Sequence, residues 1–508
     1  MSWAIVHSRA SAGIQAPAVS VEVHISGGLP RFSVVGLPET TVQESKDRVR
    51  SALLNSQFEF PRRRITVNLG PADLRKQGSR FDLPIALGIL AATEQIPKSE
   101  LNVYEFTGEL ALSGEIRPVQ GALPFALATC KSDRKLILPV ANAEEASLAS
   151  RATILPAAHL LDVCAHLSGS QLLTSHVQAW PELPVKSAEL DMADVLSQYH
   201  AKRALEIAAA GQHSLLMMGP PGTGKSMLAN RLPGILPDMN EAESLEVAAI
   251  QSICKSFDYN TWKIRPFRAP HHTTSCVALV GGGSPPSPGE ISRAHYGVLF
   301  LDELPEFSRS ALEALREPLE AGYVTIARAT YHLVFPARFQ LIAAMNPCPC
   351  GFYGQVDGHC QCATAQIQRY QTRISGPLLD RMDLHVNVPL LAKGSLSADT
   401  AIVGETTAVI KARVCKARQI QLERCGQVNA RLTEKEIRQI CRLSSADQKL
   451  LEEAMEKFRL SARAYHRVLK VARSIADLAG SAELNSDHLM EALSYRGSLR
   501  RVQMMGAT

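Results

Sequence analysis

The chain lacks a long apolar run, and its first residues, MSWAIVHSRASAG, lack a basic segment followed by an apolar one. A helix that crosses a membrane needs about 20 largely apolar residues in succession. A secretory signal needs the basic and the apolar segment in that order. We therefore expect no membrane span and no secretory signal, which predicts a cytoplasmic protein without a membrane partner.

Excess charge of one sign and a regular set of cysteines are also missing. The formal net charge is only +5 over 508 residues, and the 11 cysteines are an odd number, most of them scattered singly. Secreted disulfide frameworks use even, patterned sets of cysteines, so this usage indicates a reducing compartment. A charge so close to balance does not by itself indicate nucleic acid, and any basic binding surface must be local.

The composition is that of a globular protein, with 46% hydrophobic and 20% charged residues. A chain of this length predicts about two to four domains. Residues 1–172 alternate β-rich runs with apolar helical stretches, and residues 173–193 read as a polar, proline-containing linker. Strand-helix alternation resumes over residues 194–391. Residues 392–508 are charged and helical in period, which predicts an all-α C-terminal part.

A phosphate-binding motif lies at the start of the second part. GPPGTGKS follows the apolar strand SLLMMG and precedes the helix-like MLANRL, which is the context that G-x-x-x-x-G-K-[ST] requires. Glycines let backbone N–H groups approach phosphate oxygens, and the helix N-terminus favours negative charge. Lys225 is predicted to contact the β- and γ-phosphates and Ser226 to coordinate Mg²⁺. The predicted nucleotide-binding loop comprises Gly219, Pro220, Pro221, Gly222, Thr223, Gly224, Lys225 and Ser226.

Two further apolar strands end in polar side chains that suit ATP hydrolysis. GVLFLDE ends in Asp302 and Glu303, and FQLIAAMN ends in Asn346. Asp302 is predicted to hold Mg²⁺ and Glu303 to polarise the attacking water. Asn346 is predicted to orient that water and to sense the γ-phosphate. The alternative for the acidic pair is a cap of the following helix.

Four cysteines form two Cys-x-Cys pairs directly after Asn346, in NPCPCGFYGQVDGHCQC. Four thiolates can bind Zn²⁺ tetrahedrally, which predicts a possible structural zinc site within an insertion over residues 348–362. Cys-x-Cys is less usual than Cys-x₂-Cys, so four plain thiols or a redox pair remain alternatives. The predicted ligands are Cys348, Cys350, Cys360 and Cys362.

Several segments together resemble the AAA+ ATPases of the magnesium-chelatase and MCM branch, and within it the ComM/YifB (Mg chelatase-like) family. The segments are RPFRAPHHTTS (265–275), PGEISRAHYGVLFLDELPEF (288–307), LREPLEAG (315–322), AAMNPCPCG (343–351), SGPLLDRMDLHV (375–386) and SARAYHRVLKVARSIADL (461–478). N-terminal FDLPIALGIL and FTGELALSGEIRPVQGAL also fit, so the resemblance covers nearly the whole chain. It implies an α/β multidomain protein: a Lon-protease-like α+β domain, a central AAA+ P-loop α/β domain and an all-α lid.

The resemblance also assigns roles to arginines and a state of assembly. Arg381 corresponds to an arginine finger that acts on the nucleotide of a neighbouring subunit, which implies a homohexameric ring. Arg463 matches the second sensor, with Arg467 as the alternative. The chain departs from the family pattern at Tyr296, where relatives often carry Asn, and at VLSQ (195–198), which replaces a commoner glycine-containing turn.

The N-terminal domain lacks the serine-lysine dyad of its Lon-type relatives. The lysine is expected within PVQGALPFA (118–126), where this chain has Leu123, and Ser79 does not lie in the Pro-Ser-Ala-Gly turn. A serine hydroxyl without a base is a poor nucleophile. The domain is therefore predicted to be proteolytically inactive and to serve ring formation or DNA guidance.

The resemblance implies an ATP- and Mg²⁺-dependent branch-migration helicase for branched or single-stranded DNA, which aids natural transformation beside other recombination proteins. Residues 322–335 read as a β-hairpin, which in the MCM branch points into the ring channel. Its predicted DNA contacts are Arg328, Tyr331 and His332. The alternatives are an ordinary exposed turn for the hairpin, and a metal-chelatase motor or a protein unfoldase for the chain.

Two other basic segments have open interpretations. Residues 265–272 offer two arginines and two histidines that organise either a DNA contact or a subunit interface. A predicted helix from about residue 407 carries a basic face that reads as a solvated surface or a DNA-binding surface. Its residues are Lys411, Arg413, Lys416, Arg418 and Arg424.

Overall fold

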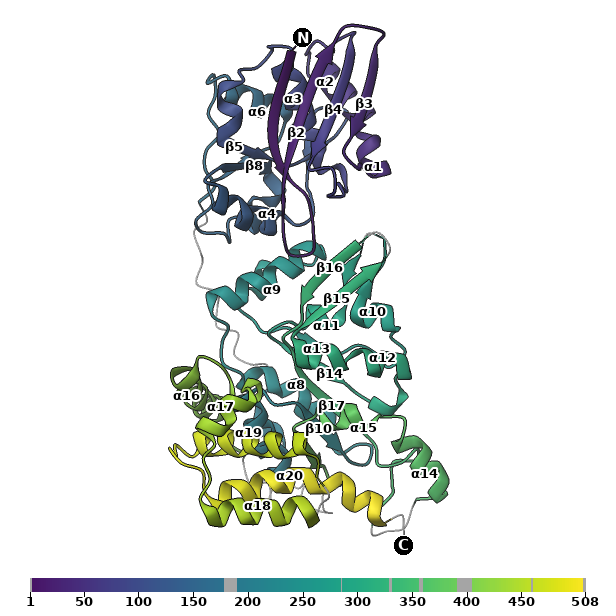
Figure 1. Cartoon of the computed structure of the whole chain (residues 1–508), viewed down its shortest axis with the longest axis vertical. Helices are drawn as coiled ribbons and strands as arrows, with labels where there is room; N and C mark the ends of the chain where they lie inside the picture. The colour runs from purple at the N-terminus through teal and green to yellow at the C-terminus, as the bar shows by residue number, and fades with distance from the viewer. Residues whose placement is uncertain are drawn as a thin grey trace.

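The computed structural model describes residues 2–177, 190–284, 286–328, 331–355, 360–390, 404–457 and 460–505. The chain is elongated, with an N-terminal domain at one end, a central domain, and a helical C-terminal part beside the central domain at the other end (Figure 1). This confirms the predicted α/β multidomain class with an all-α C-terminal part. Within the described part of the chain, no helix combines the length and the apolar character needed to cross a bilayer.

The N-terminal domain is built on a mixed seven-stranded sheet in the order β3-β4-β2-β1-β5-β8-β9. Its inward-facing Val, Ile and Leu side chains pack against the fully buried helix α3. The strands are β1 (Ser2–Arg9), β2 (Ala18–Ser26), β3 (Arg31–Val35), β4 (Arg64–Gly70), β5 (Tyr104–Phe106), β8 (Lys135–Pro139) and β9 (Ile154–Ala157), with a small ribbon of β6 (Glu109–Leu110) and β7 (Ile116–Arg117). The helices are α1 (Thr40–Gln43), α2 (Ser45–Asn55), α3 (Asp82–Ala92), α4 (Ala122–Thr129), α5 (Ala143–Ala146) and α6 (Leu160–Leu167).

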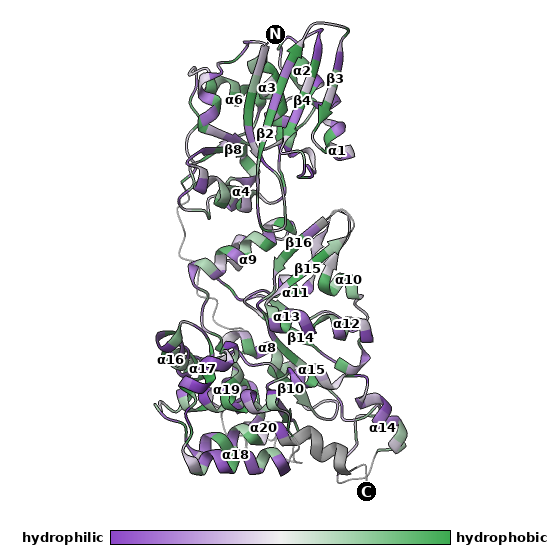
Figure 2. Cartoon of the chain, viewed as in Figure 1, coloured by the Kyte–Doolittle hydropathy of each residue, from purple (hydrophilic) through white to green (hydrophobic). Residues whose placement is uncertain are grey.

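The central domain is built on a five-stranded parallel sheet in the order β11-β14-β17-β10-β18. Neighbouring residues of β10 face opposite cores: Leu215 and Met217 pack on one side, and Leu216 and Met218 on the other. A parallel strand that is covered on both faces reads as one continuous apolar run, which is why SLLMMG shows no alternation. The hydropathy colouring shows the same apolar character along the strands (Figure 2).

The elements of the central domain follow in chain order. The sheet strands are β10 (Leu215–Met218), β11 (Phe267–Arg268), β14 (Val298–Leu301), β17 (Gln340–Met345) and β18 (Leu384–Asn387). Two hairpins are added, β12 (Gly281–Gly282) with β13 (Ser287–Pro288), and β15 (Tyr323–Arg328) with β16 (Tyr331–Pro336). The helices are α7 (Tyr199–Gly211), α8 (Lys225–Ile235), α9 (Glu241–Ile253), α10 (Cys276–Val280), α11 (Glu290–Arg293), α12 (Arg309–Ala314), α13 (Arg316–Ala321), α14 (Thr364–Gln371) and α15 (Gly376–Asp380).

The C-terminal helices share one hydrophobic core with the central sheet. Side chains of α16, α19 and α20 join those of α7, α8 and β10 in the same buried cluster. These helices are α16 (Thr407–Cys425), α17 (Glu434–Ile440), α18 (Ser445–Lys457), α19 (Ala462–Leu478) and α20 (Ser486–Met505). Asp191, in the predicted linker, accepts hydrogen bonds from the backbone and hydroxyl of Thr407 at 2.7 and 3.0 Å, and so belongs to this assembly.

The arginines of the basic face predicted on α16 are only partly exposed and make contacts within the protein. Arg413 forms an ion pair with Glu206 at 2.6 Å, and Arg424 pairs with Asp477 at 2.7 Å. Arg418 donates to the carbonyls of Ala209 and Ala210 at the end of α7. Since a guanidinium group carries only donors and needs acceptors, Arg413 and Arg418 tie α16 to α7 of the central domain. Arg424 ties α16 to α19 within the helical part.

A small apolar interface joins the N-terminal and central domains. Leu123 and Phe125 of α4 pack in one cluster with Ala248 and Ala249 of α9 and with Trp262. Leu123 is therefore a buried packing residue of this interface.

Candidate functional site

The phosphate-binding loop connects β10 to α8 at the carboxyl edge of the central sheet. The Gly219 N–H donates to the Met345 carbonyl at 3.2 Å, and a Cβ atom on Gly219 would lie 2.1 Å from the Val388 carbonyl oxygen. Gly222 and Gly224 have φ values of 76° and 87°, a region that favours glycine. The conformation of the loop thus requires glycine at these positions, in addition to the need for phosphate oxygens to come close to the backbone.

Lys225 begins α8 and lies at the centre of the loop. Its Nζ donates to the carbonyls of Gly219 and Pro220, each at 2.7 Å, and to Asn346 Oδ1 at 3.1 Å. Burial lowers the pKa of Lys225 from its usual value, and the charges of Asp302 and Glu303 oppose this shift. The structure therefore brings the predicted lysine and the predicted sensor amide together.

The two residues predicted to bind magnesium, Ser226 and Asp302, also meet. Ser226 Oγ donates to Asp302 Oδ2 at 2.6 Å, and Asp302 Oδ1 accepts the backbone N–H of Glu303 at 2.9 Å. Because β14 and β17 lie beside each other and β17 lies beside β10, their carboxyl ends converge on α8. A hydroxyl and a carboxylate at this place are the oxygen ligands that Mg²⁺ takes beside nucleotide phosphates.

Glu303 has a partner that the sequence did not reveal. Its Oε2 lies 3.0 Å from Nδ1 of His272, and its backbone is left-handed, with φ of 51° and ψ of 46°. This backbone turns the chain into the short helix that follows β14. His272 therefore holds the Glu303 carboxylate beside the phosphate loop in this structure.

The other polar groups of residues 265–272 are also used within the chain. Arg265 donates to the carbonyls of Pro237 and Tyr296 at 2.6 and 2.7 Å. Arg268 makes a two-pronged ion pair with Glu290 of α11 at 2.6 and 2.9 Å. These contacts secure the strands and helices around the site.

Both departures from the family pattern fall on left-handed backbone. Tyr296 has φ of 53°, and Ser197 and Gln198 have φ of 55° and 53°. Asn and Gly tolerate this region better than other residues, so Tyr296, Ser197 and Gln198 carry some backbone strain. Gln198 offsets the strain with hydrogen bonds from its Nε2 to the carbonyls of Pro389 and Thr223, at 2.8 and 3.4 Å.

Arg381 lies in a separate cleft of about 360 Å³ that is lined mainly by α13 and the end of α12. Its Nη2 pairs with Glu320 at 2.7 Å, and its Nη1 donates to the Pro377 carbonyl at 2.8 Å. Among the described residues, none of its hydrogen bonds or ion pairs reaches the phosphate loop of the same chain. Arg316, which sequence reasoning missed, lines the same cleft.

The two candidate second-sensor arginines lie one turn apart on α19. Arg463 is exposed in the first turn and makes no hydrogen bond or ion pair to any described residue. Arg467 donates to the Arg381 carbonyl at 2.7 Å and pairs with Asp383 at 2.6 Å. Charge from Arg467 and a hydrogen bond from His213 keep the pKa of buried Asp383 far below its usual range, against the effect of burial. Arg467 thus ties the lid to the loop that carries Arg381, whereas Arg463 is free to meet a ligand.

The predicted hairpin is confirmed by antiparallel pairing of β15 with β16, from Tyr323 opposite Pro336 to Arg328 opposite Tyr331. It stands away from the sheet at the end of the central domain that faces the N-terminal domain (Figure 1). His332 is exposed, whereas the two residues between the strands lie outside the described ranges.

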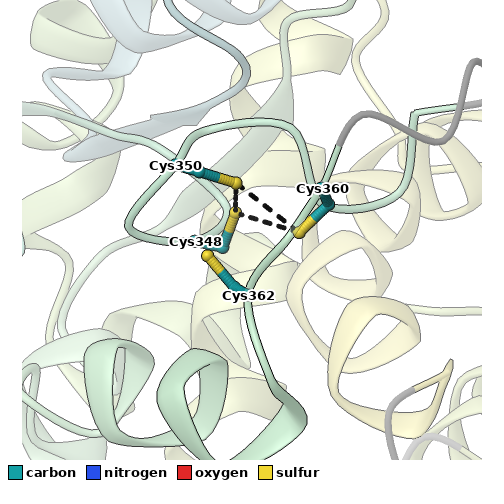
Figure 3. Close-up of side chains that lie close together, drawn as sticks. All are labelled: Cys348, Cys350, Cys360 and Cys362. Carbon is teal, nitrogen blue, oxygen red and sulfur yellow. Dashed lines mark hydrogen bonds between the residues drawn. The ribbon is translucent and has the colours of Figure 1, made fainter.

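The four cysteines converge, as predicted, with their sulfur atoms turned toward one another (Figure 3). Their Sγ atoms all lie within 4.8 Å of one another. Three of the separations are 3.3 Å for Cys348–Cys350, 3.7 Å for Cys348–Cys360 and 3.6 Å for Cys350–Cys360. At a Zn–S distance of about 2.3 Å, the sulfurs of a tetrahedron lie about 3.8 Å apart. The set therefore fits a zinc ion.

The cysteine loop touches the phosphate-binding loop. A Cβ atom on Gly351 would lie 2.6 Å from Cδ of Pro221, and the φ of Gly351 is 86°. The carbonyl of Pro347 accepts a hydrogen bond from Gln371 of α14 at 2.9 Å. The chain after Asn346 is thus held between the nucleotide loop and α14. A change in the conformation of the cysteine loop would therefore shift both of them.

The fold and the site define a P-loop ATPase of the magnesium-chelatase type. Three family descriptions match this chain: "Magnesium chelatase, subunit ChlI" over residues 191–396, "Subunit ChlI of Mg-chelatase" over residues 21–142, and "Magnesium chelatase, subunit ChlI C-terminal" over residues 404–496. The family implies ATP and Mg²⁺, which the loop around Lys225 and the pair Ser226–Asp302 suit.

Individual relatives narrow the assignment. The chain is 54% identical to the Competence protein ComM of Haemophilus influenzae over 99% of both chains. It is 50% identical to the Uncharacterized protein YifB of Escherichia coli over 98% of this chain and 97% of the relative. Identity to the Magnesium-chelatase subunit ChlI of Nephroselmis olivacea is 26%, over 34% of this chain and 54% of that protein. The chain belongs to the ComM/YifB family of Mg chelatase-like AAA+ ATPases, as its sequence predicts.

Proposed function

We propose that the protein is an ATP-driven DNA branch-migration helicase, which works as a homohexameric ring on branched or single-stranded DNA in the cytoplasm during natural transformation. The observation that carries the proposal is the full-length likeness to a competence protein. The β15–β16 hairpin supports it, because one such hairpin in each subunit would give the motor a small contact with a DNA strand that is repeated around the ring. The formal net charge of only +5 is consistent with DNA contacts that are confined to such a small area.

The ring is proposed because Arg381 has no contact with the phosphate loop of its own chain among the described residues. A neighbouring subunit would supply its nucleotide to the cleft that Arg381 and Arg316 line. In that arrangement Lys225 and Ser226 hold the phosphates and Mg²⁺, Glu303 polarises water, and Arg381 neutralises charge on the transferred phosphoryl group. Arg463 is the proposed second sensor.

One assay tests the function directly. ATP turnover is measured with and without branched DNA, beside migration of a labelled four-way junction. The proposal requires DNA to accelerate turnover and the junction to move only with ATP. A chelatase motor, which the shared fold with ChlI subunits also allows, would respond to porphyrin and partner subunits and ignore DNA; an unfoldase would respond to unfolded protein.

The hairpin is predicted to couple the ATPase to DNA. Changing Arg328 and Tyr331 together to alanine is expected to remove most of the DNA stimulation, since a phosphate contact and a stacked base of about 1–3 kcal/mol are lost at each subunit. Basal turnover is expected to persist. Tyr323→Ala, at the exposed base of the same strand, serves as the matched control. Loss of basal and stimulated turnover in equal measure would contradict a DNA-specific role for the tip.

We also propose that the four cysteines hold one structural Zn²⁺ per chain. Metal analysis of the purified protein is expected to find about one equivalent, and Cys360→Ser is expected to lose the zinc and to lower the melting temperature, because metal binding contributes folding free energy. Cys415→Ser, a partly buried cysteine of α16, is the matched control and should keep the metal. Zinc below about half an equivalent in the parent protein would rule the site out.

A further inference from the structure

A second cleft lies between the N-terminal and central domains, away from the nucleotide loop. Its volume is about 500 Å³, within the range of small-molecule sites. One wall comes from the N-terminal domain and the other from the segment that ends α9. The lining residues used below are Ser79, Arg80, Glu109, Glu144, Glu145 and Lys255.

Arg80 is the unusual member of this lining. It is 7% exposed, and within the described part of the chain neither its Nε nor its Nη1 has a hydrogen-bond acceptor. Its guanidinium carbon lies 4.8 Å from the centroid of the Phe125 ring. Burial lowers the pKa of Arg80 to about 10, so it stays charged at neutral pH. A buried charge without a counter-charge is unfavourable, and a group of this kind calls for a missing partner.

The nearby carboxylates are already in use. Asp82 pairs with Arg48 at 2.7 Å and accepts the Leu110 N–H at 3.3 Å. Glu145 accepts the Leu123 N–H at 3.2 Å and the hydroxyl of Ser252. These bonds direct both carboxylates to other donors.

Glu109 is engaged in the same way, since it accepts the hydroxyl of Ser79 and pairs loosely with Arg117 at 3.8 Å. The structure therefore leaves the Arg80 guanidinium as a buried donor that faces a cleft.

The charges around the cleft select the ligand. Arg80 offers a planar fork that suits one carboxylate. Three carboxylates, Glu109, Glu144 and Glu145, line the same cleft with a single lysine, Lys255. The excess of negative charge opposes a polyanion such as a nucleotide and favours an ammonium group. We propose that this cleft binds a molecule that carries one carboxylate and one ammonium group, of the size of an amino acid or a short peptide, with the carboxylate on Arg80.

Binding to the full-length protein tests the proposal by calorimetry with four probes. Trialanine is expected to bind, whereas trialanine with a C-terminal amide is expected to bind about 10- to 100-fold more weakly, because a charge-assisted hydrogen-bond pair is lost. Alanine distinguishes the two classes of ligand. If alanine binds more weakly than trialanine, the ligand is a peptide terminus; if the two bind equally, it is a free amino acid. Inorganic phosphate binding in place of trialanine, or binding of none of these probes, would overturn the proposal.

Two variants locate the ligand. Arg80→Met keeps the side-chain volume and removes the charge, so it is expected to abolish trialanine binding while the melting temperature without ligand stays equal to the parent value or rises. A lower melting temperature would show that Arg80 serves folding and would overturn the assignment. Arg62→Met, an exposed arginine of the same domain, is the matched control. Glu109→Gln is expected to weaken trialanine but not its N-acetyl form; equal loss for both would overturn the ammonium contact.

Discussion

Replacing Glu303 with glutamine is expected to reduce ATP turnover by about 10²–10⁴-fold, the contribution of a positioned general base. Glutamine keeps the shape of the side chain, and the Ser226–Asp302 contact at 2.6 Å does not involve it. Nucleotide binding should therefore remain, and strand movement should stop. Turnover is measured with saturating ATP, and binding with a fluorescent nucleotide.

The matched control for this change is Glu306→Gln. Glu306 lies three residues further along the chain and pairs with Arg373 at the surface at 2.8 Å, so turnover should stay near the parent rate. An unchanged rate in Glu303→Gln would show that another group activates the water. Loss of nucleotide binding together with turnover would mean that the variant is misassembled rather than lacking a base.

Arg381→Ala is expected to reduce turnover by about 10³–10⁵-fold, the usual contribution of an arginine finger. The residue contacts Glu320 and the Pro377 carbonyl in its own chain, so its effect on the reaction must pass through a neighbour. Mixing tests this. Lys225→Ala subunits lack the phosphate-binding lysine but keep Arg381, and Arg381→Ala subunits have the reverse defect.

Each variant alone should be nearly inactive, whereas rings assembled from both should regain a measurable part of the parent turnover, because some interfaces then hold an intact lysine opposite an intact arginine. Arg309→Ala, an exposed arginine at the start of α12, is the control for charge alone. Activity of the mixture that equals the sum of the separate variants would show that Arg381 does not act on the nucleotide of a neighbouring subunit.

The cysteine cluster links these results to stability. Asn346, two residues before Cys348, bonds to Lys225, and Gly351, directly after Cys350, packs on Pro221. Disorder in that loop would reach the nucleotide site through both contacts. A loss of zinc is therefore expected to lower ATP affinity as well as the melting temperature. A zinc site without contacts to the nucleotide loop would change only the melting temperature.

Side-chain pairing over long sequence distances was beyond sequence reasoning. His272 meets Glu303, and Arg413 meets Glu206, because helices and strands far apart in the chain pack together. The basic residues of α16 recur at the spacing of one helix face, which by itself indicates an exposed surface. Only the packed structure shows that Arg418 points into carbonyls at the end of α7.

The sequence by itself determined the nucleotide loop, the Asp302–Glu303 pair, the hairpin and the grouping of four cysteines. Each depends on close spacing, where local backbone geometry and residue type decide the chemistry. The tertiary structure decided which groups meet: Lys225 with Asn346 and Arg467 with Asp383. It also left Nε and Nη1 of Arg80 with no acceptor among the described residues. The physical reason is that burial and charge pairing depend on the packing of distant elements, which spacing along the chain does not record.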